Sequence, residues 1–127
     1  MRDRPGRSRL AVGFLAGALL VASGLMHSLL GWREMRAAFS PTGAPPDLVA
    51  GLAVPWHFAG LSMVTFGVLV IAGFMGAARR REGSLRTPRI IALAYVAFAI
   101  GGAIFIKLDP TFLLFLVPGA MVLAASS

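Results

Sequence analysis

An apolar segment becomes polar within Ser23-Gly24-Leu25-Met26-His27-Ser28-Leu29-Leu30-Gly31-Trp32-Arg33-Glu34. Residues 10–32 lie between Arg9 and Arg33 and carry no formal charge over 23 positions. At a rise of about 1.5 Å per residue, a helix of this length spans roughly 35 Å. The core of a bilayer is about 30 Å thick, so the segment is long enough to cross it. The stretch therefore predicts the end of a first membrane-spanning helix.

The composition favours lipid as the solvent of the whole chain. Of its 127 residues, 57% are hydrophobic and 13% are charged, and the mean hydropathy is +0.81. A soluble domain typically carries about 25% charged residues. The formal net charge of +7 comes from arginines beside apolar runs, which favours anionic lipid headgroups on the cytoplasmic side, not nucleic acid, as partners. The chain contains no cysteine, which excludes disulfides and thiolate chemistry.

Further apolar runs predict three more crossings. Residues 48–78 and 90–106 carry no formal charge, and residues 111–125 follow the turn Lys107-Leu108-Asp109-Pro110. We expect an all-α protein, an integral membrane antiparallel four-helix bundle that forms a single domain over residues 1–127. The membrane helices are expected at about residues 10–32, 55–78, 90–106 and 111–125.

The segment between the first two helices combines charges with glycine and proline. We expect residues 33–47 to form a loop outside the membrane. Asp47 is placed to cap the helix that follows. Pro55 leaves two interpretations open, because the second membrane helix could begin there or a longer helix could be kinked there.

Arginine and lysine residues predict the orientation, because cytoplasmic segments of membrane proteins carry an excess of them. The N-terminal tail and the connector after residue 78 hold nine, namely Arg2, Arg4, Arg7, Arg9, Arg79, Arg80, Arg81, Arg86 and Arg89. The opposite segments hold three, namely Arg33, Arg36 and Lys107. This bias predicts a multi-pass protein of the bacterial inner membrane with both termini in the cytoplasm. A signal peptide cleaved near residue 24 is the alternative for the first segment.

Two histidines at the outer ends of the first two helices, His27 and His57, are the candidate cofactor-binding residues. Gly24 and Gly31 lie near the face of His27 at helical spacing, and Gly60 lies near the face of His57. Glycines allow helices to approach closely, and they also make room for a macrocycle beside an axial ligand. Two uses of this pattern stay open: plain helix packing, or a haem b or quinone held near the two imidazoles. We expect no metal site, because the residue spacing matches no metal-ligand motif, and a divalent site formed by His27, His57 and Glu34 or Asp109 is the lesser alternative.

Polar residues at the same boundary predict an outer polar rim formed by Arg33, Glu34, Lys107 and Asp109. Water at the membrane interface solvates such residues, so a rim of this kind is commonly structural. Trp32 and Trp56 flank the same boundary and are expected to anchor it at the headgroups.

Two short motifs resemble a group of small bacterial membrane proteins. They are His27-Ser28-Leu29-Leu30-Gly31-Trp32-Arg33-Glu34 and Trp56-His57-Phe58. The resemblance implies four helices, the first ending in His-Ser-x-Leu-Gly-x-Arg and the second beginning with Trp-His. Pro55, immediately before the second motif, departs from this pattern. The resemblance implies that the two histidines are paired, and it implies no activity.

These patterns favour a non-enzymatic membrane protein, an accessory, assembly or binding component. Its glycine-rich helix faces are expected to contact its own helices, a second copy or another protein. The alternatives are a redox protein with haem b or quinone near His27 and His57, and a small-molecule transporter. Proton-coupled transport normally needs a carboxylate within the membrane, and the predicted crossings contain none.

Overall fold

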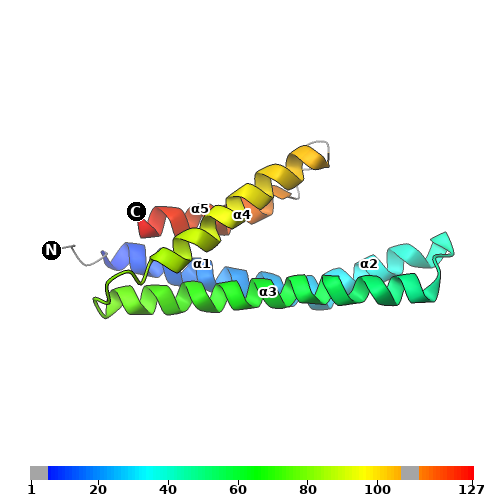
Figure 1. Ribbon diagram of the computed structural model, residues 1–127, viewed down its shortest axis with the longest axis horizontal. Coiled ribbons are helices and arrows are strands. Elements are labelled where there is room, and N and C mark those ends of the chain that lie inside the picture. The colour runs from blue at the N-terminus through cyan, green and yellow to red at the C-terminus, as the bar shows by residue number, and fades with distance from the viewer. Residues whose placement is uncertain (1–5, 107–111) are drawn as a thin grey trace.

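The computed structural model describes residues 6–106 and 112–127, and within them every element is helical (Figure 1). The first helical stretch consists of α1 (Arg7–Met26), a π-helical segment (His27–Gly31), α2 (Trp32–Phe39) and a short 3₁₀ turn (Ser40–Thr42). The remaining helices are α3 (Pro46–Ala78), α4 (Arg86–Phe105) and α5 (Leu113–Ser126).

Three of these helical stretches are long and apolar enough to cross a membrane. They are Arg7–Thr42 with 36 residues, Pro46–Ala78 with 33 and Arg86–Phe105 with 20. At about 1.5 Å per residue, the first two reach roughly 50 Å, well beyond a bilayer core of about 30 Å. They form a hairpin that extends past α4 and α5, to the right in Figure 1.

The structure corrects the expected connection between the first two helices. Residues 33–47 were expected to be a loop, and a helix was expected to end at residue 32. Instead the chain stays helical through Thr42, and Pro46 already begins α3. The turn between them is short, with Gly43 at a φ of 66° in the left-handed region. Charged residues end an apolar run without ending a helix, since Trp32-Arg33-Glu34-Met35-Arg36 contains no helix breaker.

Pro55 lies inside α3, nine residues after its start. Of the two interpretations of this proline, the longer helix is the one observed, and the predicted start at residue 55 is wrong. The start of α3 instead has Pro46 at its first position and Asp47 in its first turn. Both residues suit a helix N-terminus, because proline there sacrifices no hydrogen bond and a carboxylate interacts favourably with the helix dipole. Asp47 makes no side-chain capping hydrogen bond.

The later helices start or end a few residues from their expected positions. α4 runs from 86 to 105 where 90–106 was expected, and α5 runs from 113 to 126 where 111–125 was expected. The tight turn predicted at Lys107-Leu108-Asp109-Pro110 lies outside the described residues.

Glycines form the contact between α1 and α3, which run in opposite directions. A Cβ atom on Gly24 would lie 2.6 Å from the carbonyl oxygen of Gly60, and one on Gly67 would lie 2.7 Å from that of Gly17. Both distances are too short for real atoms, so the two backbones touch where each pair of glycines meets. Gly17 and Gly24 are seven residues apart, as are Gly60 and Gly67, which is the repeat that keeps one helix face on its partner.

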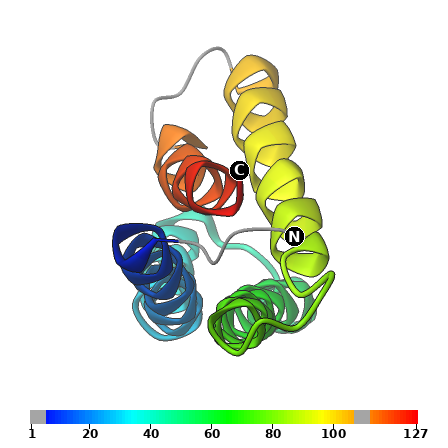
Figure 2. The ribbon, with the colours of Figure 1, turned by 90° about the vertical axis from the view of Figure 1, so that its left-hand side faces the viewer.

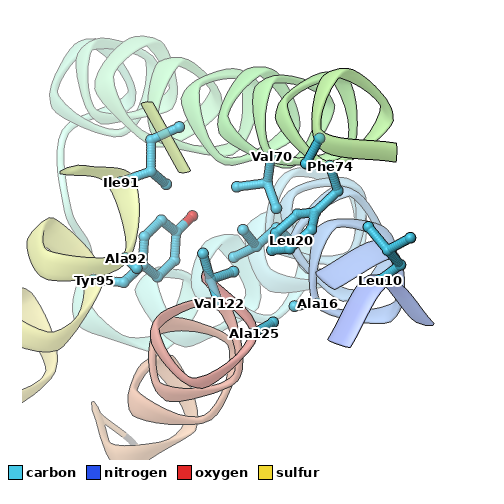
Figure 3. Packing of buried hydrophobic residues seen from close by; sticks show 11 residues of the cluster. Leu10, Ala16, Leu20, Val70, Phe74, Ile91, Ala92, Tyr95, Val122 and Ala125 are labelled. Carbon is cyan, nitrogen blue, oxygen red and sulfur yellow. The ribbon is translucent and has the colours of Figure 1, made fainter. Parts of the chain in front are cut away.

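The other helices complete a ring in which α1 contacts α3 and α5, and α4 contacts α3 and α5 (Figure 2). The core lies between them, and its largest fully buried side chains include Leu20, Val70, Phe74 and Val122 (Figure 3). Tyr95 of α4 is 7% exposed in the same core, and its hydroxyl has no hydrogen-bond partner among the described residues.

Arginines from two helices hold the end of α5. A guanidinium nitrogen of Arg9 donates a hydrogen bond to the Ser127 carbonyl at 2.7 Å, and Arg89 donates to the carbonyl of Ser126. These carbonyls lie at the end of the helix, where cations are favoured by the dipole. Both arginines had been assigned to lipid headgroups from the sequence, and the structure gives them this additional contact.

Candidate functional site

Two histidines and two tryptophans form one cluster, the His–Trp cluster, between the first helical stretch and α3. His27 of the π-helical segment stacks on Trp56 of α3, with ring centroids 4.3 Å apart and planes 9° from parallel. Trp32 of α2 lies against His57 of α3, with centroids 5.6 Å apart at 59°. The two tryptophans also contact each other, at 6.2 Å. The cluster therefore crosses the helix pair twice, and each imidazole packs on an indole from the opposite helix.

The π-helical segment explains why His27 and Trp32 share a face. In an α-helix, two residues five apart are separated by about 140° around the axis. The wider turn of a π-helix, with hydrogen bonds from i to i+5, brings such residues toward the same side. His27 begins the segment and Trp32 directly follows it. Both side chains therefore reach α3, which an uninterrupted α-helix would not allow.

A hydrogen bond joins the same two helices inside the cluster. The indole Nε1 of Trp56 donates to the backbone carbonyl oxygen of His27 at 2.8 Å. Gly60 lies one helical turn after Trp56, and Ser28 occupies the space beside it. A Cβ atom on Gly60 would overlap the hydroxyl oxygen of Ser28. At Gly31 a Cβ would lie 3.2 Å from the Trp56 ring. The structure thus places Gly24, Gly31 and Gly60 in the contact between the first helical stretch and α3.

One polar atom of the cluster has no partner. The Nε2 atom of His27 is buried and forms no hydrogen bond with a described residue. The side chain as a whole is partly exposed, as is that of Trp56. A buried imidazole nitrogen is costly to leave unpaired, so this atom is the point in the cluster where a hydrogen-bonding ligand gains most.

The haem hypothesis required space beside the histidines, and the space beside two of the glycines is occupied. The carbonyl of Gly60 and the side chain of Val64 fill the position next to Gly24, and Ser28 fills that next to Gly60. An indole also covers one face of the His27 imidazole, and a second indole, tilted by 59°, contacts the imidazole of His57. In the described part of the chain, no group of three or more His, Asp or Glu residues is arranged to hold a metal ion.

The predicted polar rim is described at two of its four residues. Arg33 and Glu34 lie on α2 and are exposed. Lys107 and Asp109 lie outside the described residues, so a rim shared by all four stays a prediction. Besides its neighbours along the chain, α2 contacts α3, and it carries Arg33 and Glu34 along the extended end of the hairpin.

Sequence reasoning missed the role of the tryptophans. Their expected anchoring at the headgroups stays a prediction, and the structure adds that both are partly buried and pack against the histidines. The spacing along the sequence did not indicate this pairing, because a Trp five residues after His27 lies about 140° away around an α-helix. No protein-family model, no curated protein and no solved structure matches the chain.

Proposed function

We propose that the chain is a multi-pass membrane protein, an antiparallel four-helix bundle with both termini in the cytoplasm, and acts as a non-enzymatic accessory or assembly component. Three helical stretches of suitable length and apolarity support its insertion into lipid. The arginine bias described above supports the orientation. Arg9 and the end of α5 lie together, which supports placing both termini on one side.

The observation that carries the accessory role is the exposed surface of the extended hairpin. Along one stripe of α3, at spacings of four and three residues, the exposed fractions are 72% for Val54, 68% for Phe58 and 62% for Leu61. α4 and α5 do not reach the α2 end of the hairpin in Figure 1, and the exposed fractions show that neither helix covers these three side chains. A partner helix with the same spacing would cover the stripe in a bilayer.

The His–Trp cluster supports the same role, because it connects the two helices of the hairpin and stiffens it. Two ring contacts and one hydrogen bond connect the helices at that level. A rigid surface loses less conformational entropy on association than a mobile one, which suits an assembly component.

Site-specific cross-linking in cells tests this proposal. Because the chain contains no cysteine, Phe58→Cys carries a unique thiol for a benzophenone label. We expect one defined protein adduct at position 58 and none at the matched position Leu93→Cys, which is 57% exposed on α4. Lipid adducts alone at both positions would contradict an accessory role. Reporter fusions at both termini test the orientation separately.

A second candidate, a membrane redox protein, is favoured by the unpaired Nε2 of His27. A quinone carbonyl would accept a hydrogen bond from this nitrogen and place its ring among the aromatic side chains. The absorption spectrum of the purified protein separates the candidates. A Soret band, or co-purifying quinone, that is lost in His27→Ala and His57→Ala would favour redox chemistry, and a colourless, quinone-free preparation would favour the accessory role.

A further inference from the structure

The exposed side of α2 carries two arginines at the end of a long apolar helix. Arg33 and Arg36 are one turn apart, and both are exposed. The hydrogen bonds that arginine side chains donate to the described backbone come from Arg9 and Arg89, at the other end of the molecule. Both guanidinium groups of α2 are exposed, and neither donates a hydrogen bond to a described residue.

Two open cavities flank these arginines. One, of about 420 Å³, is lined by Leu29, Trp32, Arg33, Arg36, Ala37 and Ser40. The other, of about 470 Å³, lies between α2 and the start of α3 and shares Trp32, Arg36 and Ser40 with the first. The polarity of the first cavity changes along the helix. Leu29, at the N-terminal end of its lining, is apolar and 69% exposed, whereas both arginines follow toward the C-terminal end of α2.

The depth of the arginines in a bilayer follows from helix geometry, and this step depends on the membrane insertion proposed above. With Arg9 at the inner boundary, Arg33 and Arg36 lie about 36 and 40 Å along the helix at a rise of about 1.5 Å per residue. The outer headgroup region begins about 30 Å from that boundary. Leu29 then lies at the edge of the hydrocarbon core, and both guanidinium groups reach the level of the phosphates.

We propose that this face of α2 binds an anionic phospholipid, whose phosphate lies between Arg33 and Arg36 and whose acyl chain passes Leu29. Guanidinium groups bind phosphate oxygens in a bidentate manner. Glu34 is the one carboxylate adjacent to the two cations, so the face keeps a net positive charge and favours a headgroup without a cation of its own. A free phosphate ion would use the arginines and gain nothing from Leu29.

Photo-cross-linking in vesicles tests the lipid site. The full chain, with Ala37→Cys labelled by a benzophenone, is reconstituted in equal parts of phosphatidylglycerol and phosphatidylcholine with the same acyl chains. Ala37 lines the cavity, and the neighbouring exposed Ala38 does not, so Ala38→Cys is the matched control. At about 1 kcal/mol per arginine near a surface, each arginine enriches the anionic lipid about fivefold. We expect the ratio of phosphatidylglycerol to phosphatidylcholine among adducts at position 37 to be at least about five times the ratio in the bilayer, and the ratio among adducts at position 38 to equal that of the bilayer.

Charge variants identify the residues responsible. Arg33→Gln with Arg36→Gln should return the adducts at 37 to the bilayer composition, whereas Arg80→Gln with Arg81→Gln, the same loss of charge at the other end, should leave the enrichment intact. Adducts at 37 in the bilayer ratio would overturn the site. Loss of the enrichment on adding millimolar inorganic phosphate would also overturn it and indicate a free-anion site. If alkaline extraction removes the chain from vesicles, membrane insertion itself fails, whereas an inserted chain without enrichment contradicts the lipid site alone.

Discussion

Trp56 contacts both the backbone and the side chain of His27. Its indole Nε1 donates to the His27 carbonyl at 2.8 Å, while its ring stacks on the imidazole with centroids 4.3 Å apart. The acceptor is the first residue of the π-helical segment, where the backbone departs from α-helical hydrogen bonding. The irregular turn and the indole on α3 therefore stabilise each other, because the turn positions a carbonyl that the indole binds.

Replacing this indole tests the contribution of the hydrogen bond. Trp56→Phe keeps an aromatic ring and removes the donor, so the free energy of unfolding should fall by about 1 kcal/mol. Trp32→Phe is the control, since Trp32 contacts the cluster through its ring without such a bond to His27. Unfolding in mixed micelles, followed by circular dichroism, measures both variants. Equal losses of unfolding free energy in the two variants would show that ring packing, and not the hydrogen bond, provides the stability.

The π-helical segment predicts an unusual tolerance to deletion. A π-helical turn contains one residue more than the α-helical turn that would replace it. Deleting Leu30, which is 49% exposed, should convert the segment to α-helix and leave Trp32 facing α3. Deleting Leu19, which is 39% exposed in α1, should instead rotate Gly13 and Gly17 away from α3 by about 100°.

Helix content and Trp fluorescence distinguish the two deletions. The protein without Leu30 should keep its helix content and an emission maximum close to that of the parent. The protein without Leu19 should unfold at a lower denaturant fraction. If both deletions lower helix content and resistance to denaturant equally, the π-helical segment does not accommodate one additional residue in the way described.

Apolar runs and glycine spacing in the sequence were sufficient to predict the type of fold and part of the helix contact. The all-helical prediction is confirmed for the described residues, and the glycines near His27 do lie against the next helix. These features follow from local composition and from the 100° rotation per residue. They require no knowledge of how a helix ends.

Helix ends and the π-helical segment were not predictable in the same way. Hydropathy marks where a chain leaves lipid, and both helices of the hairpin continue beyond that point, to Thr42 and from Pro46. The additional residue in the π-helical segment is compensated by tertiary contacts with Trp56, which no local pattern encodes. The pairing of His27 with Trp56 and of His57 with Trp32 therefore required the structure.

Close approach of the backbones predicts a sharp difference between two glycines of α3. A methyl group on Gly60 would overlap Ser28 and lie 2.9 Å from the carbonyl of Gly24, whereas one on Gly51 would meet no atom within 4 Å. Gly60→Ala should lower the free energy of unfolding by about 1–3 kcal/mol, since α1 and α3 must separate. Gly51→Ala should leave it unchanged or raise it by up to about 1 kcal/mol, because alanine favours helix. Mixed-micelle unfolding of the two variants provides the comparison, and a tolerated Gly60→Ala would contradict the close contact.

The arginines at the end of α5 predict that equal charges on α4 contribute unequally to stability. Arg89 donates a hydrogen bond to the carbonyl of Ser126, whereas Arg86, three residues earlier, lies in the first turn of α4, where a cation is unfavourable. Arg89→Gln should therefore lower the free energy of unfolding by about 1 kcal/mol, and Arg86→Gln should leave it unchanged or raise it slightly. On the proposed topology both variants lose one positive charge near the same membrane surface, so their affinity for anionic lipid should fall by the same amount. Denaturant titrations at low and high salt separate these effects, because the difference between the variants should persist at high salt while any shared loss disappears. Equal destabilisation by the two substitutions would show that Arg89 acts only as a surface charge.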